Sequence, residues 1–388
     1  MSRKKLAPKL RFPEYRDVSE WQYKRLDELF SERNIKNHPN KQVLAATQDR
    51  GVIPYQQLEK SIIRERKNLV GYKIVFPGDF IISLRSFEGG FEYSGEEGII
   101  SPAYTIIYLK QKLNMLFFRY YFKRRKFVYH IQQILNLSLR DGKSINYKQA
   151  SELLIIYPEK TEQQKIADCL SSLDELIDAH SKKLDALKEY KKGLMQQLFP
   201  AEGKTQPKLR FPEFKKAPKW KRTELEKISY NISSGKDKNL SFGKYNLYGS
   251  TGIIGKTING TYDGKFILVA RVGANAGLLT KTNGRFGVTD NTLVIQLHED
   301  VYFDFIFSLL ENYKLNNLVF GSGQPLITGS QLKAISLYLP ELKEQQKIAD
   351  CLSSIDENIK SQTQKIESLK HHKKGLMQQL FPSPEDIK

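Results

Sequence analysis

The sequence predicts an α+β chain with a pseudo-twofold internal repeat. Two similar mixed α/β domains are separated by two long helices, which form an antiparallel coiled coil. Three observations support this fold class. The chain of 388 residues is too long for one ordinary domain. Several segments of its first half return in its second half, and a heptad pattern of apolar residues follows each copy of a variable region.

The repeat is strongest at the two ends of each copy. PKLRFPEY at 8–15 returns as PKLRFPEF at 207–214, and EQQKIADCLSSLDE at 162–175 returns as EQQKIADCLSSIDE at 344–357. The segment KKGLMQQLFP closes both copies without change. These matches divide the chain into a first domain with its entry segment (1–160), a helix (161–200), a linker and second domain (201–343), a helix (344–382) and a tail (383–388).

The variable regions share short matching segments, although the sequences between those segments differ. GDFIISLR matches GKFILVAR, SPAYTIIYL matches TDNTLVIQL, and TQDRGVI (47–53) matches YGSTGII (248–254). Their Ile, Val, Tyr and Phe runs predict strands. An aromatic-rich helical segment follows in each copy, at about 112–135 and 302–319. We therefore expect two domains of one fold whose surfaces suit two different targets.

Each long helix carries a narrow apolar seam that is apolar at eight of ten positions. If a pseudo-twofold axis relates the copies, the seams pack against each other and the helices run antiparallel. About 37 residues give roughly 55 Å, the length of about 16 base pairs. A helical hairpin inside one globule, or a seam that dimerises two chains, is the alternative. The predicted seam residues are Ile166, Leu170, Leu173, Ile177, Leu184, Leu187, Ile348, Leu352, Ile355, Ile359, Ile366 and Leu369.

The charge lies outside these helices. The chain has a net charge of +19, whereas 162–200 holds 6 basic and 7 acidic residues and 344–382 holds 6 and 5, so the two helices together are neutral. Basic domains on a neutral spacer favour a polyanionic partner, with nucleic acid first. A basic protein without such a partner is the alternative.

Several polar and basic residues are candidates for DNA contact. Arg85 and Arg271 end equivalent strands, and arginine can bond guanine through two hydrogen bonds. A phosphate contact or a plain surface charge is the alternative. The turns Gln48-Asp49-Arg50 and Gly249-Ser250-Thr251 occupy matching positions. The remaining candidates are Lys256, the basic residues of RYYFKRRKF (Arg119, Lys123, Arg124, Arg125 and Lys126), and the late-loop residues Lys143 and Gln324.

In RYYFKRRKF we expect a helix with its aromatic side in the core and its basic side on phosphate, or otherwise a solvated charged face. No catalytic pattern stands out elsewhere. GSTGIIGKT at 249–257 has five residues between its glycines, where a phosphate-binding P-loop needs four. The two cysteines and six histidines suggest neither a disulfide framework nor a metal site. No run of 18 apolar residues and no secretory signal is visible, so a cytoplasmic location is expected.

Taken together, these segments resemble the specificity subunit (HsdS) of type I restriction-modification systems. The paired PKLRFPE entries, the EQQKIADCLSS helix starts, the KKGLMQQLFP ends and GSGQPLITGSQLKAISLYLP at 321–340 carry the resemblance. The first copy departs from it, because 139–158 lacks the Gly-Ser-Gly turn.

The resemblance implies a non-catalytic subunit with two target recognition domains, each recognising half of a split, asymmetric site in double-stranded DNA. The helices would set the spacing and dock two modification (HsdM) methyltransferase subunits. Restriction (HsdR) subunits would complete the complex. S-adenosylmethionine, ATP and Mg would bind these partners, and this chain would hold no cofactor.

Two other classes of function are open at this point. A coiled-coil scaffold could use basic heads to bind RNA or acidic proteins. A stand-alone methyltransferase or nuclease would show activity in the purified chain, which the absence of catalytic motifs disfavours. Salt-dependent binding to duplex DNA of defined sequence would separate the specificity subunit from the scaffold.

Overall fold

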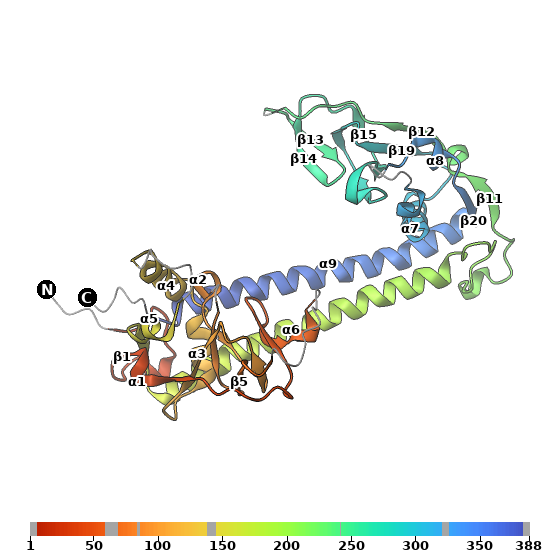
Figure 1. Cartoon of the computed structure of the whole chain (residues 1–388). Coiled ribbons are helices and arrows are strands. Elements are labelled where there is room, and N and C mark those ends of the chain that lie inside the picture. Colours follow the sequence, from red (N-terminus) through yellow and green to blue (C-terminus); the bar gives the residue numbers. More distant parts are fainter. Residues whose placement is uncertain are drawn as a thin grey trace. The chain divides into compact units, whose positions relative to one another are not determined.

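The computed structural model describes residues 6–58, 69–83, 86–137, 145–240, 242–319 and 326–382. The chain divides into two compact units, the first made of Met1–His180 with Lys365–Lys388 and the second of Ser181–Gln364. Each unit therefore holds one variable domain, the first part of one long helix and the last part of the other (Figure 1).

The first unit contains a four-stranded antiparallel sheet in the order β2-β9-β6-β7 and three strand pairs, β1-β10, β3-β4 and β5-β8. Its strands are β1 (Gln22–Arg25), β2 (Phe30–Arg33), β3 (Leu44–Thr47), β4 (Gly51–Pro54), β5 (Lys73–Val75), β6 (Phe80–Ile82), β7 (Glu92–Tyr93), β8 (Gly98–Ile100), β9 (Thr105–Leu109) and β10 (Leu154–Tyr157). Its shorter helices are α1 (Leu26–Leu29), α2 (Ser86–Gly89), α3 (Met115–Phe122), α4 (Arg125–Leu137) and α5 (Tyr147–Ser151).

The second unit contains two four-stranded sheets, in the orders β12-β19-β16-β17 and β14-β13-β18-β15, and the pair β11-β20. Its strands are β11 (Lys221–Glu224), β12 (Ser229–Ser234), β13 (Tyr245–Gly249), β14 (Gly252–Thr257), β15 (Tyr262–Asp263), β16 (Phe266–Ala270), β17 (Leu279–Thr282), β18 (Arg285–Val288), β19 (Thr292–Leu297) and β20 (Ser336–Leu339). Its shorter helices are α7 (Phe303–Tyr313) and α8 (Gly329–Lys333).

The two domains share one frame, as the sequence landmarks predict. The order β2-β9-β6-β7 in the first corresponds to β12-β19-β16-β17 in the second, and the pair β1-β10 corresponds to β11-β20. The matched segments lie on equivalent strands: GDFIISLR covers β6 and GKFILVAR covers β16. The hairpins β3-β4 and β13-β14 correspond in the same way. The predicted α+β fold with an internal repeat is confirmed.

The long helices α6 (Lys160–Leu198) and α9 (Leu342–Gln379) are each continuous, and in each unit a part of α6 lies beside a part of α9 (Figure 1). In the first unit Lys373 pairs with Asp174, and in the second Lys191 pairs with Asp356. The two pairs occupy equivalent positions of the repeat, since Asp174 corresponds to Asp356 and Lys191 to Lys373. Six predicted seam residues are buried, namely Ile166, Leu170, Ile348, Leu352, Ile355 and Ile366, and the other six are half-buried.

Aromatic side chains dominate the core of the first unit, as the composition of 112–135 suggests. Phe117, Phe118 and Phe122 on α3 are fully buried. The rings of Phe118 and Phe122 contact Phe30 of β2, and the ring of Phe117 contacts Phe118. The same core takes in the start of α6 and the C-terminal turn of α9. The helical segment expected at about 112–135 is present as two helices, because the chain breaks between Phe122 and Arg125 and forms an elbow between α3 and α4.

An arginine in each entry segment fastens the chain to the first turn of a long helix. Arg11 contacts Glu162 through two hydrogen bonds of 2.9 and 2.7 Å, and Arg210 contacts Glu344 at 2.9 and 2.6 Å. Both glutamates are 1% exposed. Glu162 also accepts a hydrogen bond from Trp21 Nε1, whereas Trp220 Nε1, buried in the second unit, finds no partner among the described residues.

We therefore expect Arg11→Ala and Arg210→Ala each to lower the free energy of unfolding by about 3 kcal/mol or more, because each leaves a buried carboxylate without its cation. Arg210→Ala should be the more damaging, since Glu344 then lacks the tryptophan donor that Glu162 keeps. Urea unfolding of the full chain measures both. Lys165→Ala and Lys347→Ala, which break exposed ion pairs, are the controls. Losses no larger than those of the controls would contradict the assignment.

Candidate nucleic-acid interface

The predicted turns form the tips of equivalent hairpins. Gln48 and Arg50 are exposed between β3 and β4, where the backbone N–H of Arg50 donates to Thr47 Oγ1. Ser250 and Thr251 form the two-residue turn between β13 and β14. The chain reverses there because the next residue, Gly252, has φ +92°, a conformation that other residues rarely adopt. Both tips offer polar side chains that can reach a groove.

Lys256 lies on β14, behind the tip of the second hairpin. Its ammonium donates to Asn246 Oδ1 across the hairpin at 2.8 Å, and the residue is exposed. It shares this hairpin with Ser250 and Thr251, so the structure gathers these three predicted residues on one element.

Arg271 lies where β16 ends, as its place in the sequence predicts. Its backbone N–H donates to the carbonyl of Asn291, and its own carbonyl accepts from the N–H of Ile327. The Nε atom is buried and finds no partner among the described residues, while the residue as a whole is half-buried. The backbone of Arg271 is thus held in place by its hydrogen bonds to Asn291 and Ile327. No hydrogen bond or ion pair between described residues joins Arg271 to the β13-β14 hairpin.

The elbow of the first domain separates its basic residues into three environments. Arg119, Arg125 and Lys126 are exposed. Lys123 is half-buried, donating to Glu92 Oε1 at 2.7 Å and to the carbonyl of Gln48 at 3.0 Å. Through that contact the structure brings the elbow against the β3-β4 hairpin, two features that the sequence presents separately.

Arg124 departs from the prediction that the basic residues of RYYFKRRKF contact phosphate from one outward face. It is only 5% exposed, with its guanidinium over the ring of Tyr121 at 3.8 Å. Its Nε donates to the carbonyl of Tyr121 and its Nη1 to that of Pro382. The prediction is corrected here: Arg124 lies beneath the surface, where it closes the C-terminal end of α3, because the helix break turns it inward.

Three other predicted residues, Arg85, Lys143 and Gln324, lie outside the described residues. Two further features of the structure do not follow from the sequence patterns. Lys370 and Lys374 of α9 lie beside the elbow. The run KHHKK marks them in the sequence, but acidic residues elsewhere in α9 cancel its positive charge when the net charge of the whole helix is counted. The second feature is a set of exposed apolar side chains near the β13-β14 hairpin, namely Phe242, Ile253, Ile254 and Ile258.

Within the described ranges, no group of three or more His, Cys, Asp or Glu residues is arranged to hold a metal ion. Over the same part of the chain, no helix is long and apolar enough to cross a membrane.

Comparison with known proteins gives one family. Residues 18–189 and 197–371 match the family model described as "Type I restriction modification DNA specificity domain". The MjaVIII type I restriction enzyme specificity subunit of Methanocaldococcus jannaschii is 25% identical over 355 residues, which cover 81% of each chain. The EcoprrI specificity subunit of Escherichia coli is 27% identical over 128 residues, 33% of this chain and 31% of that relative.

Two solved structures share the fold. A type I restriction-modification S subunit from M. genitalium matches with a TM-score of 0.63 and 16% identity, covering 97% of this chain and 99% of that one. A chain from a study of complex assembly and conformational transition in the type I system matches with a TM-score of 0.57 and 14% identity, covering 93% and 97%.

The Lys123–Glu92 contact, which joins the elbow to the hairpin, gives a prediction on pH. Burial raises the pKa of Glu92, and Lys123 opposes this only in part. The folded state therefore holds a proton more tightly than the unfolded chain. The stabilisation from this group is complete below the ordinary pKa of 4.5 and is lost as pH rises through the raised folded value.

We expect Glu92→Gln to flatten the decline in unfolding free energy as pH rises from about 4.5. Urea unfolding at a series of pH values measures this, with Glu96→Gln, a change at an exposed position, as the control. A Glu92→Gln profile parallel to the wild type would refute it.

Proposed function

The chain belongs to the family of type I restriction-modification DNA specificity domains, and on this premise we propose that its two domains each recognise one half of a bipartite, asymmetric site in duplex DNA. The chain is a specificity subunit, and such subunits are non-catalytic. The proposal rests on one observation above all: the domains share a sheet frame, yet their equivalent hairpins carry different tips, Gln48-Asp49-Arg50 in one and Ser250-Thr251 in the other.

The proposed base contacts come from side chains that a fixed backbone presents. Arg271 suits this role because its backbone is bonded on both sides and its Nε is buried, so little side-chain freedom is lost on binding. The hairpin residues Gln48, Arg50, Ser250, Thr251 and Lys256 are the remaining described candidates for base or phosphate contact, with Arg85, Lys143 and Gln324 proposed from the sequence alone. Arg119, Arg125 and Lys126 suit phosphate.

The helices are proposed to set the spacing of the two half-sites and to dock two modification subunits, with restriction subunits completing the complex. Each helix belongs to both units, since α6 and α9 each pass from one into the other. A change in helix length therefore affects both domains. S-adenosylmethionine, ATP and Mg are proposed to bind the partner subunits, and the complex to work in the cytoplasm.

We expect Arg271→Ala to weaken discrimination at one half-site by about 1–3 kcal/mol and to leave the other half-site motif unchanged. Sequencing of methylated sites, made with the modification partner present, maps both motifs at once. Lys265→Ala, at an exposed position before the other end of β16, is the control. Unchanged motifs together with unchanged affinity would contradict the assignment of Arg271 as a base-contacting residue.

One heptad inserted midway along both helices should preserve their pairing and change the spacer between half-sites by about three base pairs, since seven residues add about 10 Å. A heptad inserted into α6 alone should break the seam and with it the complex. Methylation mapping and gel filtration measure these outcomes. An unchanged recognition sequence in an intact complex of the double variant would rule out a ruler role for the helices.

A further inference from the structure

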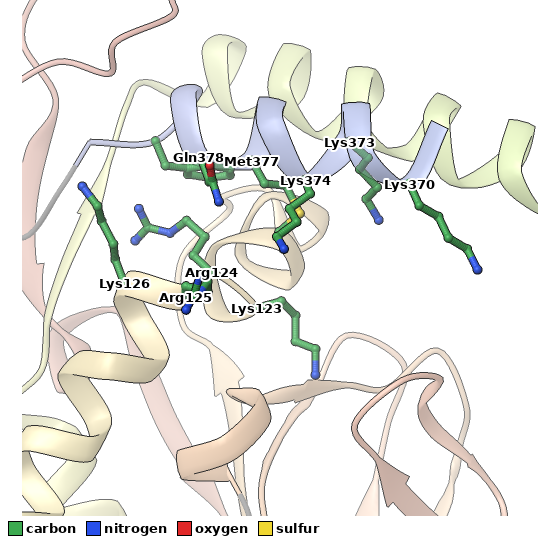
Figure 2. A pocket seen from close by; sticks show the side chains of 10 residues that line it. Lys123, Arg124, Arg125, Lys126, Lys370, Lys373, Lys374, Met377 and Gln378 are labelled. Carbon is green, nitrogen blue, oxygen red and sulfur yellow. The ribbon is translucent and has the colours of Figure 1, made fainter. Parts of the chain in front are cut away.

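A basic pocket lies in the first unit, between the elbow of α3 and α4 and the last turns of α9 (Figure 2). Its volume is about 300 Å³. Seven of its ten lining side chains are cationic, four from the elbow (Lys123 to Lys126) and three from α9 (Lys370, Lys373 and Lys374). Segments some 250 residues apart in the sequence thus place their positive charges around one cavity.

Most of these cations form no ion pair with a described residue. Lys123 pairs with Glu92, and Lys373 pairs with Asp174. For the other five cations, no ion pair is found among the described residues. Like charges held this close repel one another, and an anion in the cavity removes that cost.

Arg124 is the strongest sign that an anion belongs there. Its side chain is 95% buried, and two of its nitrogens donate to the backbone carbonyls of Tyr121 and Pro382. The third nitrogen, Nη2, is buried without a partner among the described residues, and no described carboxylate pairs with the guanidinium. Burial lowers the pKa of Arg124, yet arginine keeps its charge in proteins. A buried cation without a counter-charge is costly, and an anion in the adjoining cavity supplies that counter-charge.

The second unit shows that the scaffold itself does not require this charge. The backbone N–H of Asn114 donates to Gln163 Oε1, as that of Tyr302 does to Gln345 Oε1, so these two positions correspond. Nine residues further along lie Lys123 in the first unit and Glu311 in the second.

Glu311 bonds Lys191, the repeat equivalent of Lys373, at 3.0 Å. Where the second unit places an acid against this lysine of the repeated helix end, the first unit places a cation. Each of these lysines also pairs with an aspartate of the other long helix, so the difference between the units is the second acid, Glu311, in one and the cation Lys123 in the other.

We propose that this pocket binds a phosphate group. Five cations without an acid partner exceed what one carboxylate neutralises, and clustered arginine and lysine suit the several oxygens of a phosphate. The group could come from a DNA strand or from a free nucleotide, which share this chemistry. The DNA source rests on the proposed function; the pocket itself does not.

The test compares Lys370→Gln/Lys374→Gln with Lys188→Gln/Lys192→Gln in the full chain. The second pair occupies the equivalent positions of α6 and removes the same charge. Lysine acetylation of the wild-type chain, followed by mass spectrometry, is measured with inorganic pyrophosphate alone and with duplex DNA, and the two double variants enter the affinity measurement below. Pyrophosphate should protect Lys370 and Lys374 and leave Lys188 and Lys192 reactive. Protection by duplex at far lower concentration assigns the phosphate to DNA, and protection by pyrophosphate alone assigns it to a free nucleotide.

Affinity for duplex gives a second readout. If DNA is the source, the first pair of substitutions should lower the dependence of log K on log salt by about one to two units, and the control pair should not. The methylated motif should stay the same, because phosphate contacts carry no base information. Absence of sequence-specific duplex binding by the wild-type chain with its modification partner, while pyrophosphate protection is intact, would refute the proposed function and keep the pocket. No protection by either probe, equal protection of both lysine pairs, or protection only by an acidic partner protein would overturn the pocket.

Discussion

The buried ion pair between an entry arginine and a first-turn glutamate is the constraint on which each unit depends. Arg11 reaches Glu162 across 151 residues of variable domain, and its guanidinium also donates to the carbonyls of Val18 and Ser19. The arginine thus holds the start of the domain against the helix that follows its end. Because β1 pairs with β10, the chain enters and leaves the domain at one place. The two ends of the domain are therefore held together by contacts in which the β3-β4 hairpin takes no part.

This closure explains why the repeated and the variable parts of the chain are so sharply separated. The second unit repeats the ion pair through Arg210 and Glu344, and it repeats the order of the main sheet. Between these fixed points the hairpins differ in length, tip and exposed side chains. β14 is six residues long and carries exposed isoleucines, whereas β4 is four residues long with a buried centre. Because an ion pair and a strand pair join the two ends of each domain, exposed side chains between those ends can change at small cost in stability.

The sequence predicted what repeats and what is periodic. The strands, hairpins and helix seam followed from patterns within short windows, as did the position of Arg271 at the end of β16. It could not predict the break at Arg124, because that break depends on contacts with Tyr121 and the carbonyl of Pro382, which come together only in the folded unit. For the same reason, the sequence could not show that Lys123 and Lys374 line one pocket. Summing the charge of α9 gave a value near zero and concealed a local cluster at its end.

The basic cluster at the end of α9 shows that one repeated sequence can lie in two different environments. KKGLMQQLFP ends both long helices, and identical sequences suggest identical roles. Yet Lys191 meets Glu311 in the second unit, while Lys373 lies in a pocket with Lys123 in the first. The environment of the repeated segment is set by the variable domain packed against it, and the two domains supply opposite charges. A helix end that serves only as scaffold in one unit can therefore bind an anion in the other, and substitution in a variable domain is enough to create or remove that site.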